Sequence, residues 1–223
     1  MKRKHLALIA TASAFTLVGG GVSTAQMFMT SRIESRIQDE LPKASGVNAS
    51  IPLLDVPGNL ASDSIKSVNI NIKNFTLKAS GMKTPLKISA SNISKAKPTL
   101  VGSLELTATI PVSTIAKASE FGDAQIVGNT LQVAAGAGGM GKAILIPKYS
   151  NNQLYFEIKS VSIFGNEIPA SSLPADLQDQ IKSKSVRNLM PPKGLKVKSV
   201  SLGSKGLSVK MSGNNIQLGR LGL

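Results

Sequence analysis

The sequence predicts an α+β fold built on a long antiparallel sheet, whose apolar face is covered by a few helices or by curling of the sheet on itself. Long stretches alternate aliphatic residues with Ser, Thr, Asn and Lys, which is typical of antiparallel strands with one covered face. Only a few stretches show helical spacing. The 223 residues are 42% hydrophobic but 4% aromatic and contain no Trp, so the expected core is aliphatic.

Residues 1–25 have the pattern of an export signal. A basic start at 2–4 precedes the apolar run Leu6–Val18, and the small residues Ser23–Ala25 form a cleavage site. The alternative is an uncleaved anchor, because 20 residues are about enough to span a bilayer. The run of glycines before the cleavage site favours cleavage. Either interpretation places residues 26–223, expected to form a single domain, outside the cytoplasm.

A short amphipathic helix is expected next. Ser31 and Glu34 fit a capping box, and Pro42 ends the helix. One apolar stripe recurs at spacing four: Ile33, Ile37 and Leu41. The helix could lie on a membrane surface or cover a sheet, and the narrow apolar face favours the second interpretation.

Strand patterns follow. Val68, Ile70 and Ile72 alternate with polar residues, and the phase then slips to Phe75, which predicts a β-bulge near 73–74. The alternation continues in two further stretches: Leu86, Ile88 and Ala90, then Leu104, Leu106, Ala108 and Ile110. We expect one apolar and one solvated face along all of them.

The second half of the chain adds two helices and more strands. Helices are expected over 113–121, with Ser113 as N-cap, and after Ser172, with Leu173, Leu177 and Ile181 on one side. Strands are expected at about 130–135, 142–147 and 153–164. The last segment predicts a hairpin with its turn at Gly203–Gly206.

The glycine run from Gly136 to Lys142 resembles a nucleotide-binding P-loop at first sight. That loop needs Ser or Thr directly after the Lys, and Ala143 stands there. It also needs a helix to follow, whereas 143–147 is β-branched and ends at a proline. We therefore expect no nucleotide, and interpret the run as a mobile connection between two strands.

The inventory of reactive side chains is narrow. The chain has no Cys, and its one His, His5, lies in the export signal, so thiol and imidazole catalysis and ordinary metal sites are not expected after cleavage. The twelve acidic residues show no recognisable pair, which makes a two-carboxylate hydrolase a weak third alternative. No catalytic residue, cofactor or metal is predicted.

The net charge of +14 indicates an anionic partner. Residues 1–25 hold three basic and no acidic side chains, so the chain without them still carries +11. Nucleic acid is not expected, because the lysines lie among Ser, Thr and Asn with few aromatic residues for base stacking. The excess favours anionic lipid headgroups at a membrane surface.

Two stretches, "NEIPASSLPADLQDQI" and "LMPPKGLKVKSVSLGSKGLSVKMSGNNIQL", resemble the LmeA-like phospholipid-binding family of actinobacterial envelopes. The early "SRIESRIQDEL" and "SVNINIKNFTL" are similar to the start of that family, and the likeness covers roughly 28–218. The stretch "NASIPLLDVPGNLAS" departs from its early loop. The resemblance implies a long curved sheet, with a few helices, wrapped around an apolar groove or tube, anionic phospholipid as ligand and a role in lipoglycan or mannan maintenance.

We therefore expect an exported, non-enzymatic lipid-binding protein of the cell envelope. The alternative is a structural partner of an envelope glycosyltransferase. The residues expected to line the groove are Val68, Ile70, Ile72, Leu86, Ile88, Leu104, Leu106, Leu177, Ile181 and Val209. Those expected to meet headgroups or membrane are Lys196, Lys198 and Lys210. The glycine connection is expected at an end of the groove.

Overall fold

A computed structural model describes residues 22–40, 44–76, 83–96, 98–119, 121, 123–135 and 141–217. The chain divides into two compact units, described separately below. Unit 1 consists of Met1–Ala108, Pro191–Val197 and Lys210–Leu223, and unit 2 of Thr109–Met190 and Lys198–Val209. The expectation that residues 26–223 form a single domain stays a prediction. The export signal, the glycine connection and Leu41 lie outside the described residues, apart from 22–25.

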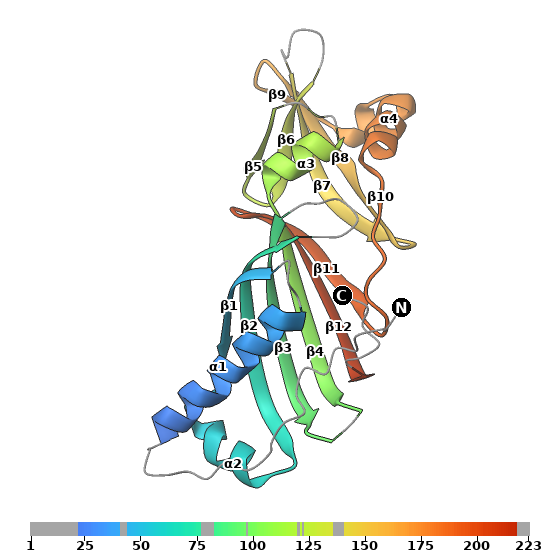
Figure 1. The fold of residues 1–223 in the computed structure, drawn as a ribbon. Helices are drawn as coiled ribbons and strands as arrows, with labels where there is room; N and C mark the ends of the chain where they lie inside the picture. The colour runs from blue at the N-terminus through green and yellow to red at the C-terminus, as the bar shows by residue number, and fades with distance from the viewer. Residues whose placement is uncertain are drawn as a thin grey trace. The chain divides into compact units, whose positions relative to one another are not determined.

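Antiparallel strands dominate, as expected, and the larger sheet curls into a half-barrel (Figure 1). Its strand order is β1-β2-β3-β4-β12-β11. The strands are β1 (Ala44–Ser50), β2 (Ser64–Thr76), β3 (Lys83–Ser94), β4 (Leu100–Ile110), β11 (Lys196–Gly203) and β12 (Gly206–Gln217). The hairpin turn predicted at Gly203–Gly206 is confirmed. The strand β1 was not expected from the sequence.

The alternation in β2 and its slip are both confirmed. Val68, Ile70 and Ile72 are buried, and the next buried position is Phe75. The pairing with β3 shifts by one residue between Ile72 and Phe75, which is the β-bulge predicted there. The bulge keeps Phe75 on the buried face after the phase change.

The same sheet buries a further row of residues near one end. Ile65, Ile93 and Val101 are paired across β2, β3 and β4, and all three are buried. Each is three residues from the buried row Val68, Ala90 and Leu104. Between Ala90 and Ile93, Asn92 has φ 51°, a left-handed conformation that interrupts the regular alternation of faces in β3. The expectation of one solvated face along all these strands stays a prediction at this end.

Helix α2 (Val56–Ala61) contacts β2 at that end, after the short 3₁₀ turn η1 (Leu53–Asp55). The buried Asn59 accepts a hydrogen bond from the Lys66 N–H at 2.8 Å. The Lys95 ammonium donates to the backbone carbonyl of Asn59 at 2.6 Å, so it caps the carbonyl end of α2. Neither α2 nor this cap was expected from the sequence.

Helix α1 (Val22–Glu40) carries two side-by-side stripes at spacing four. Ala25, Ile33 and Ile37 are buried, with the half-buried Met29 between them. The next stripe bonds the backbone beside β1. Gln26 donates to the Ile51 carbonyl, Glu34 accepts from the Ala49 N–H at 2.6 Å, and Gln38 donates to the Ala44 carbonyl at 2.8 Å.

This arrangement corrects the capping-box prediction. Ser31 lies in the middle of α1, because the helix begins nine residues earlier, and Glu34 bonds β1 instead of the helix start. The helix covers a sheet, as favoured above, and runs across the hollow of the curled sheet (Figure 1). Its polar stripe also satisfies backbone groups along the exposed edge of β1.

We expect Glu34→Ala to lower the free energy of unfolding by about 1–3 kcal/mol, because the Ala49 N–H loses a charged acceptor. Urea denaturation followed by far-UV circular dichroism measures the change. Ser31→Ala is the control in the same helix, since Ser31 is exposed there. A larger loss in Ser31→Ala than in Glu34→Ala would contradict this assignment.

Unit 2 contains a second antiparallel sheet of order β10-β8-β7-β6-β5, with β9 also paired to β8. Its strands are β5 (Ala124–Val127), β6 (Thr130–Ala135), β7 (Gly141–Ser150), β8 (Gln153–Ile163), β9 (Asn166–Pro169) and β10 (Arg187–Asn188). Leu131, Leu145 and Ile158 form one buried row across β6, β7 and β8. The strands expected at 130–135, 142–147 and 153–164 are confirmed.

Three local predictions in unit 2 need correction. Strand β7 continues through Pro147, which is tolerated because β7 pairs with β6 only as far as Leu145. Helix α3 (Val112–Ser119) starts one residue before Ser113, and the Pro111 carbonyl accepts hydrogen bonds from the N–H groups of Thr114 and Ile115. Helix α4 (Ala175–Ser185) has Pro174 at its N-cap, because Ser172 lies in a separate 3₁₀ turn, η3 (Ala170–Ser172).

Candidate functional site

Strands β2, β3 and β4 bring the predicted groove residues of unit 1 together in three rows. The rows run across the strands in register: Val68–Ala90–Leu104, Ile70–Ile88–Leu106 and Ile72–Leu86–Ala108. All seven of the predicted residues in these strands lie in this set, which we call the aliphatic face. Registers of this kind follow from alternation at period two once the strands are paired.

The aliphatic face is buried within unit 1. Ile88 and Ala108 are half-buried, and the other members are buried. Beside it, α1 contributes the buried Ile33 and Ile37, and its polar stripe holds it to β1. A single helix that is attached by a few side-chain bonds therefore lies over the hollow of the sheet (Figure 1).

The structure does not place the remaining groove candidates in unit 1. Leu177, Ile181 and Val209 belong to unit 2. Leu177 is 36% exposed on α4, Ile181 is half-buried, and Val209 is buried in β12. Helix α4 contacts β8, and the Ser185 hydroxyl of α4 accepts a hydrogen bond from the Phe156 N–H at 2.9 Å. A role of Leu177 and Ile181 in a groove stays a prediction.

The three lysines expected to meet headgroups lie on β11 and β12. Lys196 and Lys198 alternate with the half-buried Val197 on β11, so they share one face of that strand. Lys196 and the β12 residue Lys210 are exposed and belong to unit 1. Lys198 is exposed as well and belongs to unit 2.

An exposed apolar patch on unit 1 was missed by the sequence analysis. It consists of Met27 and Phe28 of α1 with Leu53 and Leu54 of η1, two elements in contact. The Arg32 guanidinium lies 4.6 Å from the centre of the Phe28 ring. The one sequence signal for this patch is the Leu-Leu pair between Pro52 and Asp55, since a 3₁₀ turn of three residues has no buried face of its own.

Next to this patch, Asp55 is held by two donors from β2. The Lys66 ammonium lies 3.0 Å from one carboxylate oxygen, and the Ser67 hydroxyl lies 2.9 Å from the other. These hydrogen bonds, that of Lys66 first, lower the pKa of Asp55 below its ordinary value of 3.8.

We expect the stability of unit 1 to depend on this carboxylate in acid. Because the pKa of Asp55 is lower in the folded state than in the unfolded state, its contribution is present above pH 3.8 and is lost as the pH falls through the lowered value. Urea denaturation of wild type and Asp55→Asn over this range measures the effect, and the two curves should converge in acid. Asp39→Asn is the control for removal of an exposed carboxylate, and equal curves for both variants would contradict the assignment.

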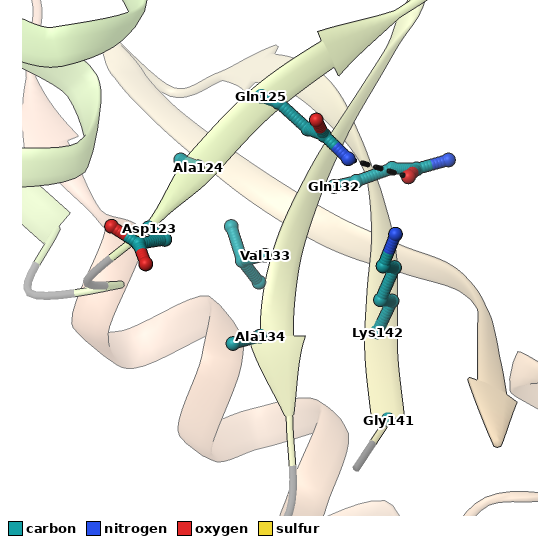
Figure 2. Close-up of a pocket in the computed structure, with 8 residues that line it drawn as sticks. All are labelled: Asp123, Ala124, Gln125, Gln132, Val133, Ala134, Gly141 and Lys142. Carbon is teal, nitrogen blue, oxygen red and sulfur yellow. Dashed lines mark hydrogen bonds between the residues drawn. The ribbon is translucent and has the colours of Figure 1, made fainter. Parts of the chain in front are cut away.

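The glycine run leads into a strand and not into a helix. Lys142 is the second residue of β7, so the helix N-terminus that a phosphate-binding loop requires does not follow it. Near it, an open pocket of ≈ 320 Å³ lies over β5, β6 and β7 (Figure 2). Its lining residues are Asp123, Ala124, Gln125, Gln132, Val133, Ala134, Gly141 and Lys142.

The pocket is too polar and too open to suit an acyl chain. Gln125 and Gln132 bond each other across neighbouring strands at 3.3 Å (Figure 2). Lys142 is exposed and lies on the same face as Gln132. Within the described part of the chain, His, Cys, Asp and Glu side chains form no group of three or more that could hold a metal ion.

Comparisons with protein families, with characterised proteins and with solved structures give no match for this chain. The architecture therefore defines only the class, a predominantly antiparallel β protein with a half-barrel sheet and a few helices. Across the described ranges, no helix combines the length and the apolar content that a membrane-spanning segment requires.

Proposed function

We propose that this chain is an exported, non-enzymatic lipid-binding protein that holds an anionic phospholipid, with its acyl chains against the aliphatic face of β2, β3 and β4. The observation that carries the proposal is that face itself. Three in-register rows of aliphatic side chains are covered beside one edge by a single amphipathic helix. The resemblance to LmeA-like envelope proteins points to the same ligand class and to a role in lipoglycan or mannan maintenance.

The dimensions and chemistry of the face suit hydrocarbon. Three strands and three rows cover roughly 10 by 14 Å at ordinary strand and residue spacings. Ten methylenes buried there would contribute about 8 kcal/mol before the costs of binding. No charged side chain belongs to the nine positions of the rows. An aliphatic face of this kind binds flexible chains without a shaped aromatic pocket.

In this proposal α1 moves to give access, since it lies over the hollow of the sheet (Figure 1) and the face is buried within unit 1. The polar stripe of α1 lowers the cost of this movement. Its three bonds to Ile51, Ala49 and Ala44 can be replaced by water when the helix leaves the sheet. Lipid would then exchange for the Ile33 and Ile37 side chains. The exposed lysines and the net charge of +11 without residues 1–25 would attract anionic headgroups.

Native mass spectrometry of protein purified without detergent tests this proposal, followed by incubation with vesicles of anionic phospholipid. We expect one lipid mass adduct per chain. A lipid-free chain that also takes up nothing from the vesicles would contradict the proposal. Leu104→Lys, which places a charge at the β4 end of the row Val68–Ala90–Leu104, should abolish the adduct, with the exposed neighbour Glu105→Lys as the matched control.

A second candidate is a structural partner of an envelope glycosyltransferase. The burial of the aliphatic rows favours it, because a closed core needs no ligand. Co-purification of such an enzyme with a lipid-free chain would support this candidate, and a stoichiometric lipid adduct would contradict it.

A further inference from the structure

The turn between β8 and β9 combines an unfavourable backbone with an exposed aromatic side chain. Phe164 has φ 48° and Gly165 has φ 84°, and the flanking residues Ile163 and Asn166 are paired. This is a two-residue hairpin turn with both central residues at positive φ, as in type I′. Glycine and asparagine favour such positions, whereas a bulky side chain at positive φ is rare.

The same sheet contains a matched turn with the favoured residues. Between β7 and β8, Ser150 pairs with Gln153, and the central residues Asn151 and Asn152 have φ 50° and 59°. Two adjacent hairpins of unit 2 thus have the same turn geometry. One has the residues that this geometry favours, and the other has phenylalanine in the first position. The backbone geometry of the turn therefore does not explain why phenylalanine stands at position 164.

Packing does not explain it either. Phe164 is 78% exposed, and the preceding Ile163 is 41% exposed. Strained backbone is often kept at functional positions, so an exposed aromatic side chain on such backbone favours a contact with something outside the chain. Both side chains lie at a hairpin tip, where they can enter another phase without movement of the sheet.

We propose that Ile163 and Phe164 form a membrane-inserting tip that seats this protein in the interface of an anionic phospholipid bilayer. Two side chains offer far less area than the roughly 800 Å² per partner of a stable protein interface, and a bilayer needs no complementary shape. The basic chain supplies attraction to anionic headgroups.

By register, the charged residues nearest to this tip are Lys142 and Glu167. Both lie opposite Ser162, and Glu167 accepts a hydrogen bond from the Ser160 hydroxyl. The inference rests on the proposed function, because it names where a lipid-binding protein meets its membrane.

The substitution Phe164→Asn distinguishes a role of Phe164 in membrane binding from a role in folding. Asparagine suits positive φ, so the thermal midpoint of the variant should equal or exceed that of wild type. Binding to vesicles that contain anionic phospholipid, measured by co-sedimentation, should weaken about ten- to hundredfold, as expected for loss of one buried aromatic side chain. Val127→Ser is the matched control, because Val127 is also exposed beside a hairpin turn but lies at the opposite end of the sheet.

Phe164→Trp provides a direct probe, because the natural chain contains no Trp. On addition of the anionic vesicles, the tryptophan emission of this variant should shift to the blue and be quenched by brominated acyl chains. Unchanged emission, or equal vesicle binding by Phe164→Asn and wild type, would overturn the inference.

Native mass spectrometry of the same samples tests the proposed function separately. A lipid adduct without a shift of the tryptophan emission would overturn the membrane tip alone. A shift without any adduct would support the tip and contradict lipid carriage. Binding of Phe164 to a protein partner instead of vesicles would also overturn the proposal.

Discussion

Ile37→Ala is expected to lower the free energy of unfolding of unit 1 by about 2–5 kcal/mol, the usual range for truncation of a fully buried aliphatic side chain. Ile37 is 1% exposed and lies on the buried stripe with which α1 covers the sheet. The substitution removes three carbon atoms from a buried position, so a cavity or a shift of the helix follows. Urea denaturation followed by far-UV circular dichroism measures the loss.

The same substitution should accelerate lipid exchange. If α1 must leave the sheet before acyl chains bind, a weaker closed state populates the open state more strongly. We expect lipid transfer from anionic vesicles to be at least about tenfold faster than in wild type. Ser35→Ala, at an exposed position of α1, should change neither stability nor transfer. A destabilised variant with unchanged transfer would contradict the role of α1 as a movable cover.

Gly206→Ala is expected to destabilise unit 2 by about 3–5 kcal/mol, through backbone strain and steric overlap together. Gly206 begins β12 with φ 132°, a conformation that side-chain-bearing residues rarely adopt. A methyl group there would also overlap the backbone carbonyl of Ile110. Backbone on both sides cannot move aside as a flexible side chain could, so the hairpin has to shift.

Tyrosine fluorescence during urea denaturation measures this effect, because both tyrosines, Tyr149 and Tyr155, lie in unit 2. Gly203→Ala is the control at the other side of the same turn, where an added methyl group meets no atom within 4 Å. Similar stability of the two variants would show that the contact between Gly206 and Ile110 is not a constraint in solution.

The strands and their faces could be predicted from the sequence to a large extent. Alternation in β2, β3 and β4 is a local pattern of period two, and seven of the predicted groove residues meet in register because that pattern fixes the face of each side chain. The bulge at 73–74 was visible for the same reason, as a slip of one residue in the alternation. The hairpin turn between β11 and β12 follows from its glycines.

Helix starts were predicted poorly. Ser31, Ser113 and Ser172 each have the composition of an N-cap, but the helices begin elsewhere. A capping residue stabilises a helix start by about 1 kcal/mol, so packing of the helix readily outweighs it. For α1, the buried stripe continues back to Ala25, and its neighbour Gln26 bonds Ile51, which favours the longer helix.

Composition and local periodicity were enough to define the class of this protein, its aliphatic interior and the side chains that share a strand face. What covers each face depends on contacts between distant segments, and these became known only from the folded chain. The burial of Ile65, Ile93 and Val101 depends on register among three strands, and the exposure of Leu177 on how α4 meets β8. The role of the exposed Phe164 could not be predicted either, because no alternation pattern encodes its positive φ or its exposure at a hairpin turn.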